Sequence, residues 1–150
     1  MEKLYIAYGS NLNLAQMANR CPSARVYEKG SLNNWELVYR GAVANSHATI
    51  VRKQGSTVPV LVWKIQPRDE YRLDIYEGYP RYYFKKNIIV DIGGRKKKAM
   101  VYIMNKWQSP GRPSAMYIET IRQGYIDNDL DMAIFEKSLE INSIECAYFS

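Results

Sequence analysis

The order of strand-like and helix-like segments is the feature that most constrains the fold of this 150-residue chain. Apolar residues at helical spacing predict helices at residues 13–20, 68–76, 115–125 and 131–141. Alternating or β-branched segments predict strands at residues 4–7, 24–27, 35–39, 48–51, 58–65, 82–91 and 98–105. The strands outnumber the helices and do not alternate regularly with them. The sequence therefore predicts an α+β fold with a mostly antiparallel or mixed sheet that curls towards a barrel.

Glycine and short polar residues mark the predicted turns between these strands. The turns are expected at Lys29-Gly30-Ser31, Gln54-Gly55-Ser56 and Gly93-Gly94. Pro67 suits the first turn of the helix at 68–76, and Ser114 is the expected N-cap of the helix at 115–125.

Length and composition predict a single domain, residues 1–150, with a proper hydrophobic core. The 47% of hydrophobic and 24% of charged residues are typical of a soluble globular protein. The apolar runs are much shorter than a membrane span, and no apolar signal region begins the chain, so we expect a cytoplasmic protein without a membrane partner. Cys21 and Cys146 are expected to be ordinary thiols, although a disulfide between them stays open.

The net charge of +6 is concentrated in Arg95-Lys96-Lys97-Lys98, directly after Gly93-Gly94. A solvated, basic hairpin tip is the interpretation that we favour. The alternative is a patch for nucleic acid or an anionic membrane. No nucleic-acid-binding motif accompanies the charge, so no nucleic-acid partner is expected.

A strand that stops abruptly and leads into a helix lies at the N-terminus. Leu4 to Ala7 reads as the strand, Gly9-Ser10-Asn11 breaks it, and a helical pattern follows. The free backbone N–H groups at such a helix start, together with the helix dipole, can bind a carboxylate or an oxyanion. Gly9 lets the chain approach a ligand closely, because it has no Cβ. The plain structural alternative is a turn in which Ser10 or Asn11 caps the helix.

Few residue types are available for catalysis. His47 is the single histidine, no convincing ligand set for a metal exists, and no serine triad, Walker or dinucleotide motif is present. Glu77 remains, at a predicted helix end with Tyr76, Tyr79 and Tyr82 close in sequence. Loss of solvation beside aromatic rings would raise the pKa of its carboxyl, which suits a general base that later acts as an acid. The alternative is a solvated glutamate before a glycine turn.

Three motifs, in this order, resemble the γ-glutamylcyclotransferase family. They are Tyr8-Gly9-Ser10-Asn11-Leu12, Glu77-Gly78 after a Leu-Asp pair, and Tyr117 to Gly124. The similarity extends from Leu4 to about Leu139.

The resemblance implies a small mixed β-barrel flanked by helices, and a reaction that needs no cofactor and no metal. The substrate's own α-amine attacks its γ-carbonyl, which releases 5-oxoproline and a free amine. Glu77 matches the family's catalytic position as general base and acid. Tyr82 is an alternative to Tyr83 in the pocket, and Tyr125 is a further candidate. The substrate-binding residues that the resemblance implies are Tyr8, Gly9, Ser10, Asn11, Leu12, Tyr83 and Tyr117.

The resemblance implies a small-molecule γ-glutamyl substrate but leaves its amine open. Family members act on γ-glutamyl amino acids, γ-glutamyl-ε-lysine or γ-glutamyl tags in biosynthetic pathways. Glutathione is not expected, because the related group that degrades it has a different signature. A monomer and a homodimer both stay open. The alternative function is a catalytically inactive protein of the same fold that binds a small ligand or an anionic partner, and the presence of Glu77 argues against it.

Overall fold

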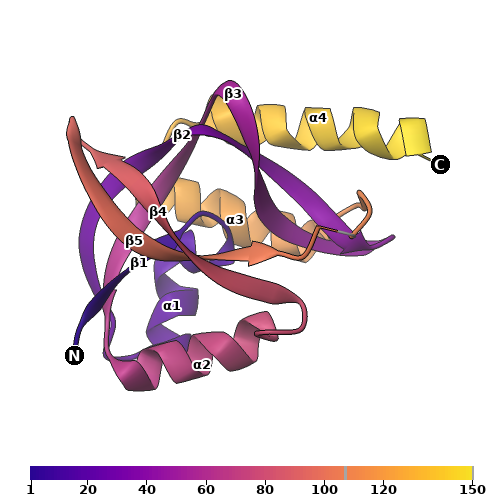
Figure 1. Cartoon of the computed structure of the whole chain (residues 1–150). Helices are drawn as coiled ribbons and strands as arrows, with labels where there is room; N and C mark the ends of the chain where they lie inside the picture. Colours follow the sequence, from indigo (N-terminus) through magenta and orange to yellow (C-terminus); the bar gives the residue numbers. More distant parts are fainter. Residues whose placement is uncertain (107, 150) are drawn as a thin grey trace.

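The computed structural model describes residues 1–106 and 108–149, which form a closed five-stranded β-barrel with helices packed around it (Figure 1). The predicted α+β barrel is therefore confirmed. In chain order the elements are β1 (Lys3–Ala7), a 3-10 turn η1 (Ser10–Leu12), α1 (Leu14–Arg20), β2 (Arg25–Ala42), β3 (Asn45–Ile65), α2 (Pro67–Glu77), β4 (Tyr83–Ile92), β5 (Arg95–Met104), α3 (Ala115–Asp127) and α4 (Met132–Phe149).

The barrel joins its strands in the order β1-β3-β2-β4-β5. Two antiparallel hairpins, β2–β3 and β4–β5, make up most of its wall. β1 closes the barrel because it lies antiparallel to β3 and parallel to β5, where Tyr5 is opposite Met100. The remaining contact joins β2 to β4 at Ser31 and Asp91. The sheet is thus mixed but mainly antiparallel, as predicted.

The helices cover different sides of this barrel. In the view of Figure 1, α2 lies below the barrel and α4 above it, and α3 runs behind the strands. α4 continues to Phe149, beyond its predicted end at residue 141. None of the helices in the described part of the chain is long and apolar enough to cross a membrane.

The predicted turn at residues 29–31 is wrong, because β2 continues through it. Gly30 is paired with Val60 and Ser31 with Pro59. A Cβ atom on Gly30 would lie 2.8 Å from the backbone oxygen of Asp91 in β4. Here the glycine allows β2 and β4 to approach each other, rather than reversing the chain.

The predicted turn at residues 54–56 is also wrong as a chain reversal, although the backbone is irregular there. β3 pairs with β2 on both sides of it, Arg52 with Trp35 and Thr57 with Asn33. The extra residues of β3 form a bulge, and Gly55 within it has φ = +86°. Glycine and polar residues therefore mark a bulge within one long hairpin.

α2 is the helix that determines where Glu77 lies, and the residues at its start and at its end define both boundaries clearly. Pro67 occupies the first turn, and the buried Asp69 carboxylate accepts hydrogen bonds from the Gln66 backbone N–H at 2.9 Å and the Ser23 hydroxyl at 2.6 Å. The helix ends where Gly78 adopts the left-handed conformation, φ = +67°.

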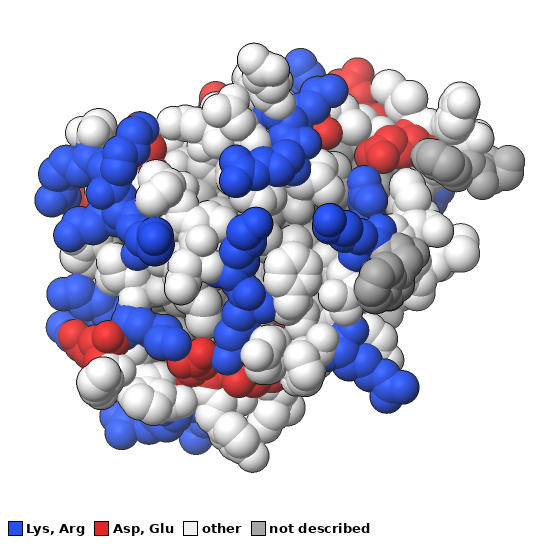
Figure 2. Space-filling view, viewed as in Figure 1, with Lys and Arg blue, Asp and Glu red and all other residues white. Residues whose placement is uncertain are grey.

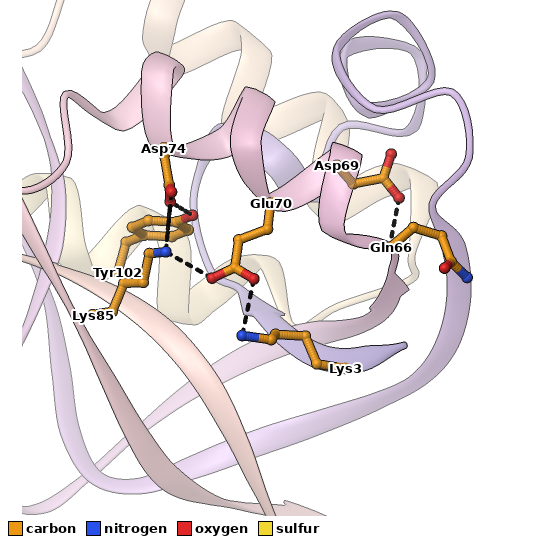
Figure 3. A network of polar contacts seen from close by, with 7 residues as sticks. All are labelled: Lys3, Gln66, Asp69, Glu70, Asp74, Lys85 and Tyr102. Carbon is orange, nitrogen blue, oxygen red and sulfur yellow. Dashed lines mark hydrogen bonds and ion pairs between the residues drawn. The ribbon is translucent and has the colours of Figure 1, made fainter. Parts of the chain in front are cut away.

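A polar network attaches α2 to the barrel (Figure 3). The Lys85 Nζ of β4 lies 2.6 Å from a carboxylate oxygen of Glu70 and 2.9 Å from one of Asp74, both on α2. Glu70 also pairs with Lys3 of β1 at 2.9 Å, and Asp74 accepts a hydrogen bond from the Tyr102 hydroxyl of β5 at 2.6 Å. Three strands thus hold one face of the helix.

We expect the substitution Lys85→Met to lower the free energy of unfolding by about 1–3 kcal/mol, because it leaves two partly buried carboxylates without their shared cation. Urea denaturation measures this change. The matched control is Lys86→Met, which removes an exposed lysine that forms no ion pair with the described residues of α2 and should change stability by less than about 0.5 kcal/mol. Equal stability of the two variants would contradict the role given to the network.

Candidate active site

A cavity of about 580 Å³ opens beside η1, between the end of α2, the β2–β3 hairpin and α3. Its volume is in the range of pockets that bind small molecules. Most of the predicted site residues line it, although they come from four separate segments. These residues are Tyr8, Gly9, Ser10, Asn11, Glu77, Tyr83 and Tyr117.

The loop after β1 presents unpaired backbone donors to this cavity. The turn closes through hydrogen bonds from the backbone N–H of Leu12 to the oxygen of Gly9 (3.0 Å) and from Asn13 to Ser10 (3.1 Å). Within the described residues, the backbone N–H groups of Gly9, Ser10 and Asn11 donate no hydrogen bond. Such groups at the start of a helical turn are available to an anionic ligand.

The cap of α1 is Asn13, whose side chain accepts a hydrogen bond from the backbone N–H of Gln16 at 3.0 Å. The alternative in which Ser10 or Asn11 caps that helix is therefore wrong. Since another residue caps α1, the side chains of Ser10 and Asn11 are free to make the contacts described below.

α3 and the residue that follows it hold the loop after β1 in place. Gly124 is so close to it that a Cβ atom would lie 2.6 Å from the Cβ of Leu12. The Asn128 side chain donates a hydrogen bond to the backbone oxygen of Leu12 at 2.7 Å, and Asn13 donates one to Thr120 at 3.1 Å. Leu12 itself is fully buried and is not among the residues that line the cavity. Its side chain anchors the loop instead.

Two predicted pocket tyrosines form hydrogen bonds with the backbone of Ala48, in the part of the cavity wall that lies next to Gly9. The Tyr83 hydroxyl donates a hydrogen bond to the Ala48 backbone oxygen at 2.7 Å, and the Tyr117 hydroxyl accepts one from the Ala48 backbone N–H at 3.0 Å. A Cβ atom on Gly9 would lie only 3.2 Å from the Ala48 Cβ and 3.6 Å from the Tyr117 hydroxyl. The absence of a side chain at Gly9 therefore keeps the loop close to this wall.

Glu77 lies at the end of α2 and faces the same cavity. Burial raises the pKa of its carboxyl to about 7, and the positive charge of Arg20 opposes that shift. Burial also raises the pKa of Tyr5, and that of Tyr8 well above its ordinary value, and the negative charge of Glu77 adds to both shifts. The negative charge of Glu77 also raises the pKa of Tyr117. The fold thus brings the carboxylate close to the loop and its tyrosines.

Arg20 and Tyr5 belong to this region although sequence reasoning did not identify them. The Arg20 guanidinium lies 3.5 Å above the Tyr76 ring and donates a hydrogen bond to the Asn11 side chain. Tyr76 in turn exchanges a hydrogen bond of 2.8 Å with the Ser10 hydroxyl. The Asn11 amide also donates to the Tyr5 hydroxyl at 2.9 Å. Spacing along the chain gives no signal for these contacts between α1, α2 and the loop.

The family model described as "Gamma-glutamyl cyclotransferase, AIG2-like" matches residues 5–121, which include the loop, Glu77 and Tyr117. The chain belongs to this family. Its members are enzymes that act on small-molecule γ-glutamyl substrates, and this chain is a γ-glutamylcyclotransferase-type enzyme.

Relatives within the family match over most of the chain. A protein from Bos taurus named gamma-glutamylcyclotransferase is 30% identical over an alignment of 151 residues, which covers 95% of this chain and 78% of that protein. The protein of the same name from Homo sapiens is 27% identical over 146 residues, covering 89% and 76%. A solved structure titled gamma-glutamyl cyclotransferase superposes with a TM-score of 0.82 at 28% identity, covering 92% of this chain and 86% of that one.

The two further tyrosines suggested by the family resemblance lie in different places. Tyr82 also lines the cavity, but it is exposed and its ring packs against Gly78, whereas Tyr83 is buried. Tyr125 is fully buried, 5.1 Å from the ring of Phe135, and does not line the cavity. Tyr83 is therefore the better placed of the two neighbouring candidates.

His47 lies in β3, as a polar strand residue, and its ring packs edge-on against Tyr117 at 4.9 Å. Burial lowers the pKa of its imidazole, so the ring is neutral at pH 7. It lines the cavity, which sequence reasoning did not anticipate.

The basic segment Arg95–Lys98 lies outside the cavity. It begins β5, directly after the Gly93-Gly94 turn, which is confirmed. Figure 2 shows lysine and arginine side chains gathered over the β4–β5 hairpin at the left of the view. Lys96 pairs with Asp91 at 2.6 Å, and Arg95 and Lys98 are exposed. The predicted position at an exposed hairpin end is confirmed, and the choice between a solvated tip and an anion-binding patch stays a prediction.

The raised pKa of Glu77 predicts a specific pH dependence of stability. The native state retains the proton between about pH 4.5 and pH 7, where the unfolded chain has released it. The wild type should therefore lose about 3 kcal/mol of unfolding free energy between pH 4.5 and pH 8, relative to Glu77→Gln, which mimics the protonated form. Urea denaturation at several pH values measures this difference.

Glu140→Gln is the matched control, because Glu140 is exposed on α4. This variant should follow the pH dependence of the wild type. A constant stability difference between the wild type and Glu77→Gln across the pH range would show that the carboxyl titrates normally.

Proposed function

We propose that this enzyme converts a γ-glutamyl amine or γ-glutamyl amino acid to 5-oxoproline and the free amine, with Glu77 as general base and acid. One observation carries the proposal. A carboxyl with a pKa of about 7 shares a cavity with the unpaired backbone N–H groups of Gly9, Ser10 and Asn11. Proton transfer is most effective when the pKa of the catalytic group is close to the working pH.

The first step is closure of the five-membered ring. The Glu77 carboxylate takes a proton from the α-ammonium of the substrate, and the freed amine attacks the γ-carbonyl carbon. No enzyme nucleophile is needed, since the attacking group belongs to the substrate and is held near its target. The carbonyl oxygen becomes an oxyanion, which the loop N–H groups stabilise.

The second step is release of the amine. The protonated Glu77 donates its proton to the leaving nitrogen, and the bond between that nitrogen and the γ-carbon breaks. The carbonyl re-forms in 5-oxoproline, and Glu77 is again a carboxylate. The extra proton of the ring nitrogen passes to the released amine, which leaves as its ammonium form. One carboxyl thus serves both steps.

Tyr8, Tyr83 and Tyr117 contribute the surroundings of this carboxyl in the proposed reaction. Burial holds the pKa of all three phenols well above the usual value, so they stay neutral. They form a wall of low polarity around Glu77, and that wall raises the pKa of the carboxyl.

The single domain and the cytoplasmic location stay predictions from the sequence, and a monomer and a homodimer both stay open.

We expect Glu77→Gln to lower the turnover number by about 10²–10⁴-fold, because it removes the group that moves both protons. The assay measures 5-oxoproline released from γ-glutamyl amino acids, γ-glutamyl-ε-lysine and glutathione. Glu140→Gln is again the control and should keep wild-type rates.

A pH profile separates acid/base chemistry from simple damage to the site. For the wild type, kcat/KM should fall as the pH drops below about 7, where Glu77 becomes protonated. Near-full activity of Glu77→Gln would overturn the assignment. A folded wild-type protein that releases no 5-oxoproline but binds it would indicate the alternative, a binding protein of the same fold.

Substitution of Gly9 tests the loop. Gly9→Val should weaken the binding of 5-oxoproline by about tenfold or more, because its branched side chain would meet Ala48 and Tyr117 and push the N–H groups out of place. Gly9→Ala adds one carbon at the tight distance of 3.2 Å and should have a smaller effect. Calorimetry on the folded variants measures both affinities. Unchanged affinity in Gly9→Val would remove the loop from the proposed site.

A further inference from the structure

The cavity has a second charged residue, which comes from a different element than Glu77. Among the described residues that line the cavity, Glu77 is the one acidic side chain and Arg40 of β2 is the one cationic side chain. Glu77 ends α2, whereas Arg40 lies two pairs from the Ala42–Asn45 end of the β2–β3 hairpin. We call the parts of the lining around these two residues the Glu77 end and the Arg40 end of the cavity.

The Arg40 end is held in place by backbone contacts. Arg40 pairs with His47 across the β2–β3 hairpin and forms an isolated bridge to Pro110. The next residue, Gly41, donates a backbone hydrogen bond to Ser109 at 2.9 Å. The strand that carries the arginine is thus fixed on both sides.

Arg40 lacks a partner for its charge. Its Nε atom is buried and has no hydrogen-bond partner among the described residues, and no acidic residue of that part of the chain forms an ion pair with it. A buried donor without an acceptor is costly, so native structures seldom leave one unmatched unless a ligand or water completes it. A guanidinium group is shaped to bind a carboxylate through two parallel hydrogen bonds.

The side chains around Arg40 suit an anion. Asn45 and Gln108 line the same end of the cavity and supply amide groups. His47, also in the lining, is neutral because burial lowers the pKa of its imidazole. No described acidic side chain lies in this end to repel a carboxylate.

We propose that Arg40 selects substrates whose leaving amine carries a carboxylate, which it binds at the Arg40 end of the cavity. This inference rests on the proposed function, in which the loop N–H groups and Glu77 hold the γ-glutamyl half. The leaving amine then extends towards Arg40. Arg40 is a specificity-determining residue for the established class of reaction and takes no part in the proton transfers.

A matched pair of substrates tests the proposal. γ-Glutamyl-L-alanine and γ-glutamyl-ethylamide differ only in the carboxylate on the leaving amine. The wild type should prefer the first by about tenfold or more in kcat/KM, and Arg40→Gln should reduce that ratio by a similar factor. Arg40→Lys keeps the charge but not the paired donors, and should retain part of the preference.

Arg52→Gln is the control, because Arg52 is an exposed arginine that stacks on Trp35 outside this cavity. It should keep the wild-type ratio. Thermal unfolding of each variant verifies that it is folded. An unchanged ratio in Arg40→Gln and Arg40→Lys would overturn the proposal. Equal losses on both substrates would also overturn it, since Arg40 would then bind the carboxylate of the glutamyl half.

A failure of the proposed function is distinguishable from a failure of this inference. If the wild type releases 5-oxoproline neither from these two compounds nor from γ-glutamyl-ε-lysine and glutathione, the proposed function fails. Calorimetric binding of the same two compounds then still decides the role of Arg40. A preference for γ-glutamyl-L-alanine that is lost in Arg40→Gln supports the proposal, and equal affinities in the wild type overturn it.

Discussion

The attachment of α2 to the barrel is the constraint on which the site depends. Glu70, Asp74 and Glu77 follow one another at helical spacings of four and three residues, so they share one face of α2. Lys85 binds the first two, and this fixes the rotation of the helix about its axis as well as its position. Because that rotation is fixed, the third carboxylate, Glu77, faces the cavity instead of the solvent.

The tyrosines around Glu77 are engaged with the backbone and not with the carboxylate. The hydroxyl groups of Tyr8 and Tyr83 donate to the backbone oxygens of Tyr102 and Ala48, and Tyr117 accepts from the Ala48 N–H. Among the described residues, none donates a hydrogen bond to the Glu77 carboxylate. Its environment therefore removes water without supplying fixed partners, which raises the pKa of the carboxyl and leaves its oxygens free for a substrate.

Sequence reasoning predicted the architecture and several of the residues that line the cavity, and it failed where tertiary contacts determine the outcome. The family resemblance and local chemistry identified Gly9, Glu77 and Tyr117, which the fold brings to one cavity. The turn predicted at Gly30 is wrong, because a glycine in the sequence can mark either a chain reversal or a close approach of two strands. Only the folded barrel shows that the second applies here. Arg40 carries no local signal at all, since its unpaired Nε becomes evident only when the surrounding strands are in place.

The way the barrel closes has a consequence for how the enzyme acquires its activity. The hairpins β2–β3 and β4–β5 join neighbouring segments and can form early, whereas β1 meets β5 across a long stretch of chain. Tyr8 and Tyr102, which share a hydrogen bond beside the cavity, are 94 residues apart. We therefore expect the site to be completed late in folding, and local opening of the N-terminal strand to disrupt it while most of the secondary structure persists.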